Sequence, residues 1–141
     1  MMPSKTIVAI LSFLFLSVSA SAHHGFGGTY DVSKEVTIKG KIVQVLMRSP
    51  HSVFVVDMDD GAGKTQRWSI EGASVTQFAR LGFPKNAFKV GDPIEIIGNP
   101  TRTEGATRAR MVKITRMVDG KSGMFDLTGE ALGVPSDAKH K

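Results

Sequence analysis

Alternating apolar and polar positions dominate this chain and indicate β-strands. From Glu35 to Met47, apolar residues recur at every second position with lysines between them, which is the period of a half-buried strand. The alternation shifts near residues 43–45, so we expect a bulge or a strong bend there. The other segments with the composition of strands are His51 to Met58, Thr65 to Glu71, Pro93 to Ile97 and Thr107 to Met117.

One short helix interrupts this series of strands. Ser74 is a suitable N-cap, apolar residues follow at helical spacing as far as Leu81, and Gly82 ends the helix. A glycine-rich turn at residues 59–63 joins the second strand to the third. The predicted order is therefore three strands, a helix and two strands.

This order predicts an all-β fold with a small α contribution, a five-stranded OB-like Greek-key barrel with one short helix between strands 3 and 4. A long, bent first strand fits, because closing so small a barrel requires one strand to serve both sheets. A generic five-stranded roll is the alternative. The predicted parts are a signal peptide (1–22), a glycine-rich arm (23–34), the barrel (35–118) and a polar C-terminal tail (119–141), in which Met124, Phe125 and Leu127 are candidates to fold back.

The predicted signal peptide combines Lys5, an apolar run at residues 7–16, and Ala20 and Ala22, the small residues after which a signal peptidase cuts. The run is shorter than the roughly 20 apolar residues that span a membrane. An uncleaved N-terminal anchor is the alternative. We expect cleavage after Ala22 or Ala20 and a periplasmic protein that does not span the membrane. The absence of cysteine suits that oxidising compartment and excludes thiol chemistry.

The chain is mildly basic, with 18 Lys and Arg against 13 Asp and Glu. Such a charge suits nucleic acid or anionic glycans, and export argues against nucleic acid. The residues that we expect to contact an anionic glycan or an envelope protein are Arg67, Arg108 and Arg110. No nucleophile elbow, phosphate loop or convincing carboxylate pair is visible, so a non-enzymatic binding module is favoured.

Histidines supply a candidate metal site. Cleavage after Ala22 would expose His23 and His24, whose α-amine and imidazoles chelate Cu(II), and His51 would add a third nitrogen. Cleavage after Ala20 would place His23 third, which also suits Cu(II). The alternative is that His23 and His24 lie in a flexible arm and His51 only packs or forms hydrogen bonds.

Glu71 and Trp68 form a second candidate pair. Glu71 would orient an imidazole from outside the metal's own ligands, or the two would bind a ligand together. The plainer interpretation places Trp68 in the core and leaves Glu71 to cap the turn at Gly72.

A family resemblance is carried by Ala22-His23-His24-Gly25-Phe26, Val36-Thr37-Ile38-Lys39-Gly40, Ser49-Pro50-His51, Trp68-Ser69-Ile70-Glu71-Gly72, Leu81-Gly82-Phe83 and Val90-Gly91-Asp92-Pro93-Ile94. Together they resemble a family of small exported Gram-negative bacterial proteins of unknown function, over roughly residues 22–116. Its members typically begin with Ala-His-His-Ser-Phe. This chain departs from the family's usual residues at Gly25, Ser49 and Phe83. The resemblance implies an exported β-barrel and no settled activity.

Overall fold

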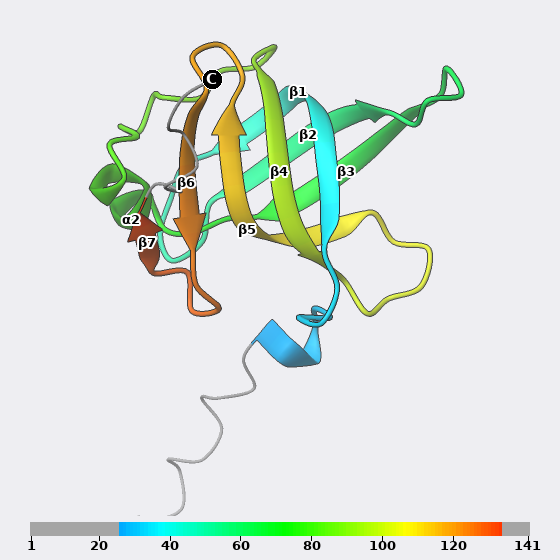
Figure 1. Cartoon of the computed structure of the whole chain (residues 1–141), viewed down its shortest axis with the longest axis horizontal. Coiled ribbons are helices and arrows are strands. Elements are labelled where there is room, and N and C mark those ends of the chain that lie inside the picture. The colour runs from blue at the N-terminus through cyan, green and yellow to red at the C-terminus, as the bar shows by residue number, and fades with distance from the viewer. Residues whose placement is uncertain (1–25, 134–141) are drawn as a thin grey trace, which may run out of the picture.

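The computed structural model describes residues 26–133. The predicted signal peptide, His23, His24 and residues 134–141 lie outside this range. The elements, in chain order, are η1 (Phe26–Gly28), β1 (Val36–Leu46), β2 (Val53–Asp59), β3 (Thr65–Glu71), α2 (Val75–Arg80), β4 (Pro93–Pro100), β5 (Arg108–Arg116), β6 (Lys121–Phe125) and β7 (Ala131–Gly133) (Figure 1).

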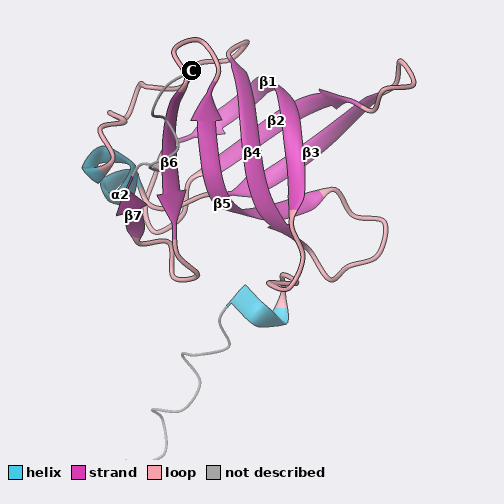
Figure 2. Cartoon of the chain, in the orientation of Figure 1, coloured by secondary structure: helices cyan, strands magenta, loops and turns pink. Residues whose placement is uncertain are grey.

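Strands β1 to β5 close into a barrel. β1 pairs antiparallel with β2 along one edge and with β4 along the other, and β4 pairs with β5. A short parallel ladder between β3 and β5 closes the circle, from Ser69–Arg108 to Glu71–Arg110. The prediction of a five-stranded OB-like barrel with a helix between strands 3 and 4 is confirmed (Figure 2).

Two local predictions are also confirmed. The register of β1 against β2 shifts between Ile42 and Gln44, where the sequence predicts a bulge, and this allows β1 to serve both sides of the barrel. Ser74 caps α2, since its hydroxyl accepts a hydrogen bond of 3.2 Å from the backbone NH of Gln77. Among the described residues, no helix has the length and apolar character needed to cross a membrane.

The core is built from alternating strand residues and a phenylalanine cluster. Phe78 of α2 is fully buried, and its ring centroid lies 5.8 Å from that of Phe54 and 4.9 Å from that of Phe125. These separations are typical of favourable aromatic pairs. The fully buried isoleucines of the strands are Ile38, Ile42, Ile70, Ile94, Ile96 and Ile114.

The chain after residue 119 differs from the predicted polar tail, because β6 and β7 extend the sheet beyond β5. Phe125 is 2% exposed and packs into the core, whereas Leu127 remains 56% exposed. The side-chain amide of Gln77 binds both Glu130 and the backbone NH of Ala131, which holds β7 beside α2. The sequence did not predict β6 as a strand, because β6 is short and contains a glycine.

Candidate functional site

An open cleft of about 270 Å³ lies where three strands of the barrel meet. Val53 at the start of β2 pairs with Glu71 at the end of β3, and Ser69 of β3 pairs with Arg108 at the start of β5. Strand register therefore brings residues far apart in the sequence to one rim. The cleft is lined by Tyr30, Arg48, His51, Val53, Ser69, Glu71 and Arg108.

Glu71 contacts two other residues that line this cleft. Its Oε2 accepts a hydrogen bond of 2.8 Å from the hydroxyl of Tyr30, and its Oε1 lies 3.7 Å from Nδ1 of His51. The side chains of His51 and Glu71 are 38% and 27% exposed, so both are open to a ligand. A smaller pocket shares His51 and Glu71 with the cleft and is also lined by Arg110.

The β1–β2 turn holds His51 in place through a buried serine. Ser52 is 0% exposed, and its backbone carbonyl accepts a hydrogen bond of 2.8 Å from the NH of Gly72. Its hydroxyl bonds back to the carbonyl of Arg48 at 3.3 Å. Arg48 in turn donates from Nε to the carbonyl of His51 at 3.2 Å. The turn is thereby fastened to the end of β3, next to Glu71.

Two buried ionisable groups lie at the cleft or beside it. Burial, followed by the hydrogen bond and the charge of Glu71, raises the pKa of Tyr30 to about 12, so its phenol stays a protonated donor at neutral pH. Arg110 is 3% exposed and donates to the backbone carbonyl of Asp126. Burial lowers the pKa of Arg110, and the nearby charges of Asp126 and Glu71 oppose that shift.

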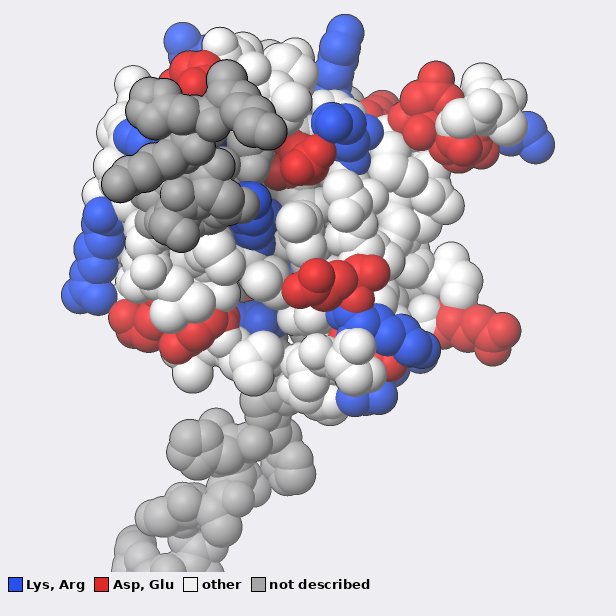
Figure 3. All heavy atoms as spheres, in the orientation of Figure 1, with Lys and Arg blue, Asp and Glu red and all other residues white. Residues whose placement is uncertain are grey.

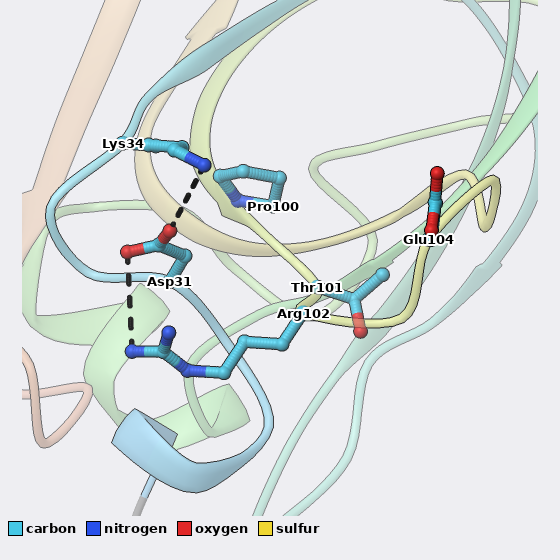
Figure 4. A pocket seen from close by; sticks show the side chains of 6 residues that line it. All are labelled: Asp31, Lys34, Pro100, Thr101, Arg102 and Glu104. Atoms are coloured by element: carbon cyan, nitrogen blue, oxygen red, sulfur yellow. Dashed lines mark ion pairs between the residues drawn. The ribbon is translucent and has the colours of Figure 1, made fainter.

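The arm before β1 is fastened to the barrel by the β4–β5 loop (Figure 4). Arg102 donates from Nε to the carbonyl of Gly27 at 2.9 Å, and the backbone NH of Asp31 donates to the carbonyl of Pro100 at 2.8 Å. The Asp31 carboxylate lies 3.3 Å from Nζ of Lys34 and 3.9 Å from Nη2 of Arg102. The arm is thus held from Gly27 onward, and this anchoring directs Tyr30 into the cleft.

Only some of the candidate residues come together. His51, Glu71 and Arg108 all line the cleft, whereas Trp68 packs against the core and donates from Nε1 to Gln66 at 2.9 Å.

The three arginines expected to meet an anionic partner do not form one surface. Arg67 is bound to both carboxylate oxygens of Asp57, at 2.7 and 2.9 Å, and Arg110 is buried. On the face shown in Figure 3, basic and acidic side chains are interspersed. Of the three, Arg108 alone is both exposed and at the cleft.

Tyr30 and Arg48 belong to the cleft but were missed in the sequence. Tyr30 lies in a glycine-rich segment without strand periodicity, 41 residues before the glutamate that it binds. Its one available signal was that it is the chain's single tyrosine. Arg48 lies three residues before His51, and that proximity was the only sign of its position.

His51 and Glu71 are the residues of the cleft that could ligate a metal. Residues 26–133 contain no cluster of three or more His, Asp, Glu or Cys side chains suited to holding a metal ion. A metal in this cleft would therefore need further ligands from outside the described residues. His23 and His24 lie in that part of the chain.

Comparison with known proteins adds one finding. The model of a family of unknown function (DUF6152) matches residues 11–110. Searches of the curated proteins and of the solved structures each found no significant match.

Proposed function

The chain belongs to this family of unknown function (DUF6152), and we propose that it is a small exported binding protein for a metal ion, with Cu(II) the best fit. In this proposal, His51 and Glu71 of the barrel complete a site with His23 and His24 of the N-terminal arm. The observation that carries the proposal is the pairing of His51 with Glu71, 3.7 Å apart, on an open cleft beside the anchored arm.

The donor chemistry fits such an ion. Imidazole and amine nitrogens with one carboxylate oxygen make up the ligand set that suits Cu(II). Glu71 would serve either as a ligand or as the partner that orients the imidazole of His51. Either role uses the contact between His51 and Glu71 that is already present.

The reach of the arm limits this assembly. Arg102 fastens the arm at Gly27, four residues after His23, and four residues span at most about 14 Å. Tyr30, three residues after Gly27, contacts Glu71, which brings the fastened part of the arm to the cleft. The proposed site therefore requires Gly27 to lie within about 14 Å of the metal.

The proposal includes a location and a role. The apolar leader and the small residues before His23 support export to the periplasm, with a free N-terminus after cleavage. No proposed step is catalytic: the protein would hold or hand on the metal.

A Cu(II) titration of the mature protein, purified untagged from the periplasm with its mass determined, tests the proposal. We expect a mass that begins at His23 and one tight equivalent of copper. His51→Ala should weaken that equivalent by about 100-fold and Glu71→Gln by about 10-fold. His140→Ala removes a histidine outside the proposed set and is the matched control. A weak equivalent that is indifferent to His51→Ala would reduce the site to an ordinary N-terminal chelate.

The alternative function is binding of an anionic glycan or protein partner through Arg67, Arg108 and Arg110. It has less support, because Arg67 is neutralised by Asp57 and Arg110 is buried. Salt-sensitive binding to an anionic polymer that survives His23→Ala and His51→Ala would favour it over the metal site.

A further inference from the structure

We propose that the cleft also binds a small oxyanion, a carboxylate or phosphate group, between the guanidinium groups of Arg48 and Arg108. The proposal rests on described residues alone and does not require a metal. It goes beyond the proposed function, because it assigns a second ligand of opposite charge to the same rim.

The first observation is which arginines lack an ion pair. Within residues 26–133, four arginines have a carboxylate oxygen within 4.0 Å: Arg67, Arg80, Arg102 and Arg116. Arg110 is buried against the carbonyl of Asp126. The two that remain without an ion pair in this range, Arg48 and Arg108, both line the same cleft. Two arginines without an ion pair that line one cavity are suited to an anion.

The second observation is how these two side chains are held. Arg48 donates from Nε to the carbonyl of His51, which fixes one edge of its guanidinium group. This is the one hydrogen bond that the Arg48 side chain makes in the described part of the chain. Arg108 lies close enough to the Tyr30 hydroxyl to act against the rise in that group's pKa. Both side chains are exposed, so a ligand reaches them without a change in the fold.

Glu71 does not neutralise the cleft. Its Oε2 accepts the hydrogen bond of Tyr30, and its Oε1 faces His51. On the barrel side, its charge also acts on buried Arg110. With Arg48 and Arg108 both charged, the lining carries more positive than negative charge. A small anion would correct this imbalance.

The dimensions favour a small ligand. A volume of about 270 Å³ lies just below the roughly 300 Å³ at which ordinary small-molecule sites begin. A carboxylate or phosphate group matches the planar donor fork of arginine and can accept two hydrogen bonds from it. The shared chemistry is the oxyanion, which can be a free ion or the acidic group of a larger molecule.

Calorimetric titration of the metal-free mature protein tests this proposal, with inorganic phosphate and malonate as separate probes at about 0.15 M ionic strength, where loose surface binding is screened. We expect saturable binding of one equivalent of at least one probe. Arg48→Gln and Arg108→Gln should each weaken it by about tenfold or more, since each removes a charged donor. Saturation by phosphate alone or malonate alone would identify the acidic group that is preferred.

Arg80→Gln is the matched control, because it removes the same charge from an arginine that is paired with Glu130 away from the cleft. It should leave affinity unchanged. Equal losses in the control and cleft variants, or no saturable binding of either probe, would overturn the proposal. A thermal melt of each variant checks that it folds. Repeating the titration on His51→Ala separates this proposal from the metal site, since phosphate binding that persists while copper binding weakens supports the anion site by itself.

Discussion

At the scale of single residues, Glu71 is the point at which three parts of the chain meet. Tyr30 comes from the arm, His51 from the turn before β2, and Glu71 itself ends β3. A half-buried carboxylate needs partners, because leaving a buried polar group without a hydrogen bond costs about 1–3 kcal/mol. The contacts therefore stabilise the fold and hold two possible ligands in one place.

The ionisation of Tyr30 tests this arrangement directly. It is the chain's single tyrosine, so the ultraviolet absorbance of tyrosinate reports one group. We expect its midpoint near pH 12 rather than 10, because burial and Glu71 both disfavour the phenolate. Glu71→Gln should lower the midpoint while leaving it above 10, since burial remains. A midpoint at 10 in the native protein would contradict the contact.

The same shift makes a prediction about stability. Because the folded pKa of Tyr30 exceeds the unfolded value, its contribution is complete below about pH 10 and is lost as the pH rises to about 12. The free energy of unfolding should fall by about 2–3 kcal/mol over that window. Urea denaturation at several pH values measures it. Tyr30→Phe should remove this part of the pH dependence, and an unchanged slope in that variant would assign it to other groups.

At the scale of elements, the sequence was sufficient for the five barrel strands and the helix. Their residues alternate over long stretches, and Ser74 and Gly82 mark the ends of α2. β6 and β7 were not predictable in the same way. β6 is stabilised by pairing with β5, and β7 by pairing with β6 and by a bond to α2. These are tertiary contacts, which leave little trace in the sequence of short segments.

A glycine in β4 tests how closely the barrel strands approach. Gly98 lies at the register shift of β4 against β5, and a Cβ atom there would lie 2.6 Å from the carbonyl oxygen of Arg110. Gly98→Ala should therefore lower the free energy of unfolding by about 1–3 kcal/mol, measured by denaturant titration. Gly28→Ala meets no atom within 4 Å and is the control. Equal stabilities would show that the strands can separate at little cost.

The fastening of the arm makes a separate prediction. Arg102→Ala removes the bond to Gly27 and the contact with Asp31, so the arm should open more often. Hydrogen exchange at the NH of Asp31, which binds Pro100, should speed up by about tenfold, while exchange in β1 stays unchanged. Lys34→Ala is the milder comparison, because it removes the ion pair that the exposed Lys34 side chain makes with Asp31 and leaves the backbone contacts in place. A uniform change at all amides would instead indicate global destabilisation.

At the scale of the whole molecule, the candidate site was predictable only in part. His51 and Glu71 stand at strand ends in the sequence pattern, and barrel closure brings such ends together. Which arginines lie at that rim depends on which strands pair with one another. The alternation of apolar and polar residues does not encode this pairing. Arg67 was grouped with Arg108 although its own position in β3 faces Asp57 of β2. Tyr30 lies at the cleft in an arm that Arg102 fastens at Gly27, 75 residues earlier in the chain.

The extent of the folded unit can be tested by truncation. A chain that ends at Val118, where the sequence places the end of the barrel, lacks β6 and with it Phe125, which packs on Phe78. Removing one buried phenylalanine typically costs about 3–5 kcal/mol, and this chain would also lose the ladder on β5. That loss approaches the whole stability of a small domain, so we expect it to aggregate or to show no cooperative melt.

The matched control ends at Gly133, since that chain retains every described element. Circular dichroism with thermal melting should show a cooperative transition for it and none for the shorter chain. The two variants also differ at the buried Arg110. It donates to the carbonyl of Asp126, which the shorter chain lacks. Removal of that carbonyl leaves a buried guanidinium beside Glu71, so the shorter chain should also lose the cleft. Cooperative melting and phosphate binding by the chain that ends at Val118 would show that the barrel is complete without β6.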